Sequence, residues 1–89
     1  MAVYCVTYDL KSPDQDYDSV HEYIKKFAYC KHLESFWLID TTKTAGTIRD
    51  ELEALVDSND TIFVARLQKA WASLNYGCTN WLKSDKRNW

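Results

Sequence analysis

The sequence has few of the residues that interrupt regular structure. Its 89 residues include only two glycines and one proline, which excludes the low-complexity and disordered classes that are rich in them. It also lacks any apolar run near the ~20 residues that a membrane-spanning helix needs. The length fits a single domain over residues 1–89 with a thin core, and we expect no membrane partner.

An excess of basic residues is missing as well. The formal net charge is -2, so the chain has no global positive field of the kind that draws proteins to duplex nucleic acid. Any contact with phosphate must therefore be local.

Cysteines are few and widely spaced. Cys5, Cys30 and Cys78 form no Cys-x-x-Cys pair, and their odd number predicts neither a disulfide framework nor a zinc site. The first residues do not have the basic and then apolar pattern of a signal peptide. We therefore expect a reducing compartment, the cytoplasm of the protein's own cell or of an infected host.

The first third of the chain predicts a strand followed by a helix. Residues 2–10 are rich in Val and Tyr and are stopped by "KSPD", which indicates a strand. Acidic turn residues follow, and Val20, Ile24 and Phe27 then recur on one helical stripe. This pattern predicts a helix from about residue 17 to residue 29.

The rest of the chain continues the alternation. In "KHLESFWLIDT" we expect a short strand, a bend near Ser35 and a stronger strand over 36–41. Thr44 is a candidate N-cap for a second amphipathic helix over 45–56. "TIFVARL" predicts the last strand of a core over about residues 2–67, and residues 68–89 form a C-terminal extension.

This order predicts an α+β fold, the ferredoxin-like β-α-β-β-α-β sandwich with two helices on one face of an antiparallel sheet. The strands "YCV", "FWLI" and "IFVA" are apolar on both faces, so the second face also needs cover. A second copy packed sheet to sheet, giving a homodimer, would provide it. The alternative is that the C-terminal extension folds back over that face.

Three segments carry a resemblance to a known family: "VTYDL", "LESFWLIDT" and "IRDELEALVDSNDTIFVARL". Together they resemble the CRISPR-associated small spacer-acquisition proteins, and they look closer still to the SinR-like bacterial and phage relatives that end in W-L-K. The resemblance covers about residues 3–83 and implies a homodimeric ferredoxin-like fold.

The family's functional residue is an aspartate at the end of the first strand, which falls on Asp9 here. The resemblance implies that two copies of Asp9 in a dimer hold one Mg²⁺ or Mn²⁺ for nuclease chemistry. Ser35 matches the serine of the second motif, whereas Leu33 stands where the family has glutamine. From the residues alone, Asp9 is equally explained as a cap of the following turn, accepting backbone N–H groups.

Other candidates surround these two residues in the predicted fold. Tyr8 precedes Asp9, and Thr41 and Thr42 end the strand that begins after Ser35; with Trp37 they complete the expected binding residues. Each also has a structural explanation, since a serine at a bend satisfies local backbone groups and a strand tryptophan belongs to the core. We expect His21 and His32 on the surface, and Cys5 as a small buried apolar residue.

The C-terminal extension offers aromatic and basic residues. Trp71, Trp81 and Trp89 could stack bases but are expected mostly to pack in the core. Lys83, Lys86 and Arg87 form a small basic cluster, and we interpret it as a flexible solvated terminus.

Two function classes therefore remain. The first is a dimeric binding protein without turnover, whose partner is nucleic acid, a nucleotide or a protein of phage and host defence. The second is a metal-dependent nuclease that uses Asp9, with a related toxin-like ribonuclease as a narrower form of it.

Overall fold

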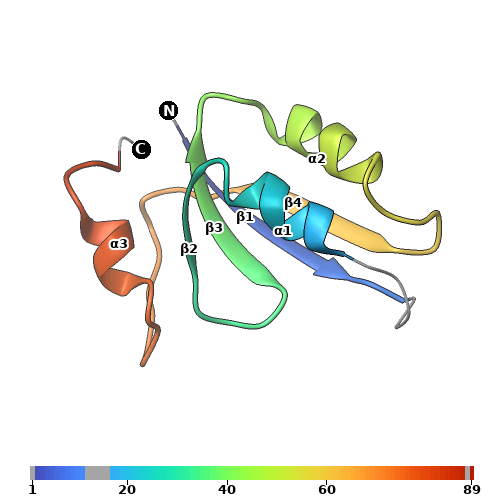
Figure 1. Ribbon diagram of the computed structural model, residues 1–89. Coiled ribbons are helices and arrows are strands. Elements are labelled where there is room, and N and C mark those ends of the chain that lie inside the picture. Colours follow the sequence, from blue (N-terminus) through green and yellow to red (C-terminus); the bar gives the residue numbers. More distant parts are fainter. Residues whose placement is uncertain (1, 12–16, 88) are drawn as a thin grey trace.

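The computed structural model describes residues 2–11, 17–87 and 89 of the chain. The element order up to the last strand is the predicted β-α-β-β-α-β, and a short helix follows it (Figure 1). The strands are β1 (Ala2–Asp9), β2 (Ala28–Lys31), β3 (Phe36–Thr41) and β4 (Thr61–Arg66), and the helices are α1 (Asp18–Ile24), α2 (Ala45–Glu53) and α3 (Thr79–Lys83).

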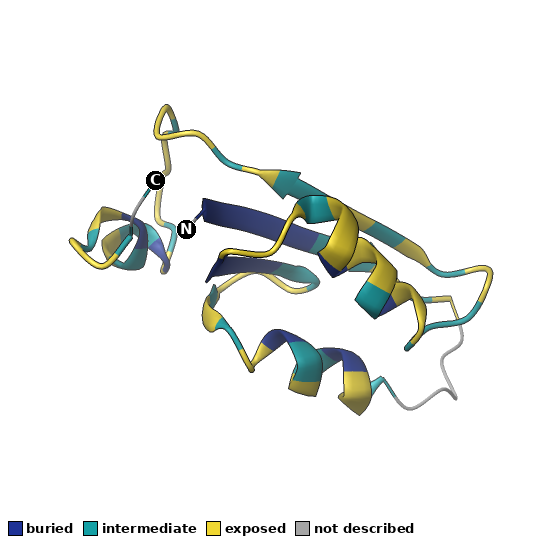
Figure 2. Ribbon diagram, turned by 90° about the horizontal axis from the view of Figure 1, so that it is seen from above, coloured by how far each residue is buried: buried dark blue, intermediate teal, exposed yellow. Residues whose placement is uncertain are grey.

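The four strands form one antiparallel sheet in the order β2-β3-β1-β4. In the register, Val6 of β1 lies between Trp37 of β3 and Val64 of β4. Because β1 and β3 are the middle strands, the buried residues concentrate on them (Figure 2). The result is an α+β fold consistent with a ferredoxin-like arrangement.

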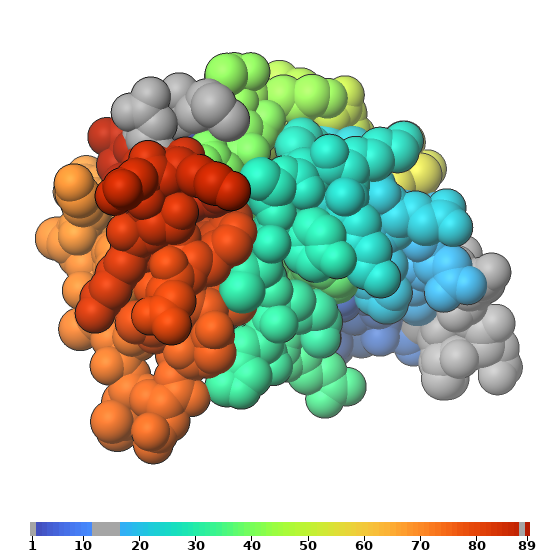
Figure 3. Space-filling view, turned by 60° about the vertical axis from the view of Figure 1, so that its left-hand side comes forward, coloured from blue at the N-terminus to red at the C-terminus, as the bar shows by residue number. Residues whose placement is uncertain are grey.

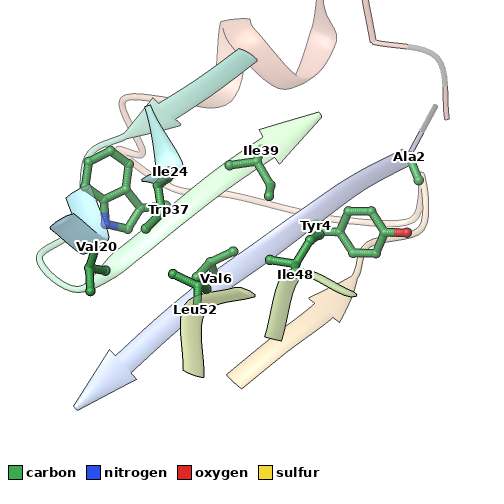
Figure 4. Packing of buried hydrophobic residues seen from close by; sticks show 9 residues of the cluster. All are labelled: Ala2, Tyr4, Val6, Val20, Ile24, Trp37, Ile39, Ile48 and Leu52. Carbon is green, nitrogen blue, oxygen red and sulfur yellow. The ribbon is translucent and has the colours of Figure 1, made fainter. Parts of the chain in front are cut away.

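The first face of the sheet packs against α1 and α2. Alternate residues of β1 and β3 point to this face, and each helix adds two buried aliphatic side chains one turn apart. The buried members of this cluster are Ala2, Tyr4, Val6, Val20, Ile24, Trp37, Ile39, Ile48 and Leu52 (Figure 4). Val20 and Ile24, on the predicted stripe of the first helix, are both completely buried.

The predicted end of the first helix is wrong. Helix α1 stops at Ile24, and Ala28–Lys31 forms the edge strand β2. Ala28–Lys31 pairs with residues 37–40 of β3, so sheet pairing overrides the helical spacing. Phe27 still packs on the first-face cluster, which explains why its position fitted the helical stripe.

Helix α2 follows the prediction closely. The hydroxyl oxygen of Thr44 accepts a hydrogen bond from the backbone N–H of Thr47 at 3.2 Å, which is the geometry of an N-cap. Ile48 and Leu52 are its buried residues. Within the part of the chain that the structure describes, no helix has the length and apolar character to cross a bilayer.

The second face of the sheet is covered in part by the end of the same chain. Here the C-terminal segment means residues 67–89, of which 67–87 and 89 are described. Cys78 and Leu82 of this segment are buried against Val3, Cys5 and Leu38 of the sheet. Figures 1 and 3 show the segment lying against the middle of the chain. The C-terminal segment, one of the two covers expected from the sequence, thus covers part of this face.

A disulfide fixes this segment to the sheet, contrary to the expectation from cysteine spacing. Cys30 of β2 is bonded to Cys78, 48 residues further along the chain. Beside the bond, the backbone N–H of Gly77 donates a hydrogen bond to Nδ1 of His32 at 2.7 Å. Spacing could not reveal the pair, because it is the fold that brings β2 next to the start of α3. Cys5 is the free thiol and is buried, as predicted.

Candidate functional site

Asp9 lies at the exposed end of β1, opposite Thr61 of β4. Its carboxylate pairs with Nζ of Lys11 at 2.5 Å, and both side chains are more than half exposed. Within the described ranges, no group of three or more acidic, His or Cys side chains could hold a metal ion. One carboxylate already paired with an ammonium group is a poor donor set for Mg²⁺, so a metal site at Asp9 would need oxygen ligands beyond those that the described residues supply.

Residues 12–16, most of the turn that Asp9 was considered to cap, lie outside the described residues; the backbone just before them, at Lys11, is held by Asp60. Its two carboxylate oxygens accept hydrogen bonds from the backbone N–H of Lys11 and of Asp57, both at 2.8 Å. The hydroxyl of Tyr17 donates to the same carboxylate. Burial opposes ionisation, but these hydrogen bonds outweigh it and lower the pKa of Asp60. One local signal could have indicated this role, since an Asp at the end of "DSND" is typical of a capped turn.

Three predicted residues meet at the other side of the β1 end. Nε1 of Trp37 donates a hydrogen bond to the hydroxyl of Tyr8 at 3.0 Å. That hydroxyl also lies 3.1 Å from Nε2 of His21, and it donates its proton to this nitrogen in the tautomer that carries the imidazole proton on Nδ1. The carbonyl of Ser35 accepts from the backbone N–H of Tyr8 and from the hydroxyl of Thr7. Tyr8, Trp37 and Ser35 are therefore neighbours.

His21 is the member of this group that sequence reasoning missed. It was expected on the surface, but it is half-buried and its ring centroid lies 5.8 Å from that of Trp37. The chain from Trp37 through Tyr8 to His21 satisfies three polar groups that would otherwise be costly to bury. This chain of hydrogen bonds fixes the end of β1 against α1 and β3.

Thr41 and Thr42 do not join this group. Thr41 pairs with Ala2 at the start of β1, whereas Phe36 pairs with Thr7 near its end. The two threonines therefore lie at the opposite end of the sheet from Asp9. Thr41 is buried, and its hydroxyl accepts a hydrogen bond from the backbone N–H of Lys43 at 3.1 Å.

The C-terminal segment forms a cleft with cationic and aromatic walls, which we call the C-terminal cleft. It has a volume of about 510 Å³ and is lined by Lys69, Trp71, Leu82, Lys83, Ser84, Asp85, Arg87 and Trp89. A smaller hollow of about 310 Å³ shares Lys69 and Trp89 and adds Arg66. The exposed cations outnumber the single acid, Asp85, so the local charge is opposite to that of the whole chain.

Arg87 anchors one wall of this cleft. Its side chain is 7% exposed, and Nη1 lies 3.3 Å from Oδ2 of Asp40, which is 2% exposed. The guanidinium lies 4.0 Å from the ring centroid of Trp81, a cation–π contact. Among the described residues, Nε and Nη1 of Arg87 and Oδ1 of Asp40 have no hydrogen-bond partner. The interpretation of Arg87 as part of a flexible solvated terminus is therefore wrong.

A further hollow, between the end of α2 and the start of β4, has an acidic lining instead of a cationic one. Its volume is about 400 Å³ and its lining residues are Arg49, Glu53, Val56, Asp57, Ser58, Asp60 and Ile62. Three carboxylates face one guanidinium there, and the lining has no aromatic ring. The C-terminal cleft is thus the better candidate for a ligand that combines phosphate with a flat ring.

Comparison with known proteins adds no assignment. No model of a known protein family matches the chain, and no solved structure matches it.

Proposed function

We propose that this protein is a small dimeric binding protein that recognises a nucleotide or single-stranded nucleic acid, without turnover. The observation that carries the proposal is the lining of the C-terminal cleft, where Lys69 and Lys83 accompany the indoles of Trp71 and Trp89. Stacking of a base on an aromatic side chain contributes ~1–3 kcal/mol, and ammonium groups attract the neighbouring phosphates. This combination suits single-stranded ligands, whose bases are open to stacking.

The geometry at Asp9 supports binding rather than catalysis. Asp9 is exposed and paired with Lys11, and its neighbours Tyr8, His21 and Trp37 satisfy one another. A metal-dependent nuclease is the alternative, in which Asp9 of a second copy would supply the missing ligand. The observation that favours this alternative is the exposed position of Asp9 at the end of β1, which leaves its carboxylate accessible to a second copy.

The dimer in this proposal uses the part of the second sheet face that the C-terminal segment leaves open. Phe63 of β4 is 59% exposed and lies opposite Thr7 of β1, which in turn lies opposite Phe36 of β3. These residues share a face with Asp9, because they alternate with the first-face residues along each strand. An exposed Phe on the same face as a half-buried one, with Thr7 between them, favours a contact with a second copy.

The resemblance of the "VTYDL" and "LESFWLIDT" segments to CRISPR-associated and SinR-like proteins supports the same proposal. It favours a cytoplasmic role in phage and host defence, with nucleic acid, a nucleotide or a defence-related protein as partner. The lining of the C-terminal cleft supports the first two of these partners.

The proposal is tested with a fluorescein-labelled oligouridylate and fluorescence anisotropy. We expect binding with a dissociation constant below about 100 μM at physiological salt. Reversing two charges, in Lys69→Glu/Lys83→Glu, should weaken binding about tenfold or more, whereas Lys25→Glu/Lys26→Glu, on exposed lysines at the end of α1, should not. Equal loss in both double variants would contradict the proposed site.

The nuclease alternative is tested by a cleavage assay. Labelled RNA and DNA are incubated with Mg²⁺ or Mn²⁺ and wild type or Asp9→Ala. The binding proposal predicts intact substrate in every sample. Cleavage by the wild type that is lost in Asp9→Ala would establish the nuclease instead.

A further inference from the structure

The walls of the C-terminal cleft come from both sides of one cross-linked residue. Lys69 and Trp71 precede Cys78 in the chain, and Lys83, Arg87 and Trp89 follow it. Cys78 is the N-cap position of α3 and is 0% exposed. The position of α3 on the sheet therefore sets the distance between the two walls, and the bond from Cys78 to Cys30 holds α3 in that position.

The other attachments of the C-terminal segment are weaker holds. The hydrogen bond from Gly77 to His32 is in the exposed region immediately next to the disulfide. The Arg87–Asp40 pair is buried with three polar atoms that lack partners among the described residues, and a buried pair of this kind contributes little net stability. What remains is a backbone hydrogen bond from Leu67 to Val3 at the start of the segment, far along the chain from α3, and apolar packing in the second-face cluster, in which Cys78 and Leu82 are the buried members of the segment.

We propose that Cys30 and Cys78 form a thiol–disulfide switch that controls ligand binding at the C-terminal cleft. This inference rests on the proposed function. In the oxidised protein the cross-link assembles the cleft. In the reduced protein α3 moves away from β2 more readily, the two walls separate, and the affinity for the ligand falls.

The chemistry balances with a small dithiol as the reductant. A thiolate of the dithiol attacks Sγ of Cys30, forming a mixed disulfide, and Cys78 leaves as a thiolate that takes up a proton. The second thiolate of the dithiol then attacks its own sulfur in the mixed disulfide, releasing the cyclic disulfide and the Cys30 thiolate, which is protonated in turn. Attack falls on Cys30 because it is only partly buried on an edge strand, whereas Cys78 is inaccessible.

Cys5 stays outside this exchange. It is a buried free thiol, and burial raises its pKa and so disfavours the thiolate that would attack a disulfide. This difference supplies the matched control. Cys5→Ala should respond to reductant as the wild type does, and Cys30→Ser should behave as the reduced protein in either condition.

The first experiment measures amide hydrogen exchange of the full chain by mass spectrometry, with and without dithiothreitol. We expect the amides of residues 76–83 to exchange about tenfold or more faster after reduction, while those of β1 and β3 change little. Equal exchange of residues 76–83 in the two states would overturn the switch. A circular dichroism spectrum of Cys30→Ser that matches wild type shows that the variant is folded.

The second experiment measures the affinity of the labelled oligouridylate in both states. We expect the oxidised protein to bind about tenfold more tightly than the reduced protein and than Cys30→Ser. Equal affinities together with faster exchange would refute control of the cleft. If neither state binds the probe, the proposed function fails, and the exchange comparison still decides whether the cysteine pair governs the position of α3.

Discussion

Nη1 of Arg87 lies 3.3 Å from Oδ2 of Asp40, in a contact that joins the end of the chain to β3. Asp40 points to the second face of the sheet, as Leu38 does two residues earlier, and that face is otherwise apolar where the C-terminal segment covers it. The pair thus specifies where the segment lies, while the apolar cluster and the disulfide hold it there. It also places the wall of the C-terminal cleft that contains Trp89.

The first prediction follows from the burial of this pair. Arg87→Met leaves the Asp40 carboxylate buried without its counter-charge, and we expect the free energy of unfolding to fall by about 3–5 kcal/mol. The double variant Asp40→Leu/Arg87→Met removes both charges and should lose less than half of that. Urea denaturation near neutral pH measures both values. An equal loss in the single and double variants would show that the two groups do not act as a pair.

The second prediction concerns acid stability at the α1–α2 contact. Hydrogen bonds from Lys43, at 2.7 Å, and from Tyr23 favour the ionised form and lower the pKa of Glu51. Because the folded pKa is lower than the ordinary value near 4.5, this contact stabilises the protein above that pH. The contribution is lost as the pH falls through the folded pKa.

Urea denaturation across a series of pH values tests this. Glu51→Gln should be less stable than wild type near neutral pH, and the difference should shrink progressively below pH 4.5. Glu22→Gln, on an exposed position of α1, is the matched control and should stay close to wild type throughout. A Glu51→Gln deficit that persists unchanged in acid would contradict the assigned cause.

The third prediction concerns Asp9. Its ion pair with Lys11 is exposed, and such pairs contribute about 0–1 kcal/mol. We therefore expect Asp9→Asn to change the melting temperature only slightly. Mn²⁺ should shift wild type and variant equally if Asp9 binds no metal. Stabilisation by Mn²⁺ that is present in wild type and absent in Asp9→Asn would support the nuclease alternative.

Local patterns predicted the elements that local chemistry decides. The strand Phe36–Thr41 and the Thr44 N-cap agree with the structure, because strand composition and capping are properties of neighbouring residues. The end of α1 was misjudged because pairing of Ala28–Lys31 with β3 is a contact between distant residues. Apolar strands on both faces correctly required a second cover, but could not distinguish another copy from the chain's own end.

The candidate site was less predictable than the fold. Tyr8, Trp37 and Ser35 do come together, and the capping carboxylate that the structure shows beside the end of β1 is Asp60, which local reasoning did not single out. The C-terminal cleft depends on the disulfide and on the Arg87–Asp40 pair, and each joins residues more than 40 positions apart. Sequence periodicity carries no information about such contacts. The aromatic and basic residues of the extension could therefore be identified, but not placed around one cleft.

The most direct test of ligand binding at the C-terminal cleft uses the indole N–H resonances of the four tryptophans. In a ¹H–¹⁵N spectrum of the oxidised protein, titration with unlabelled oligouridylate should shift the indole signals of Trp71 and Trp89, which line the cleft. The Trp37 signal should not shift, because Trp37 is buried near the start of β3 and its Nε1 is hydrogen-bonded to the hydroxyl of Tyr8. Unchanged Trp71 and Trp89 signals at saturating ligand, or movement confined to Trp37, would contradict binding at this cleft.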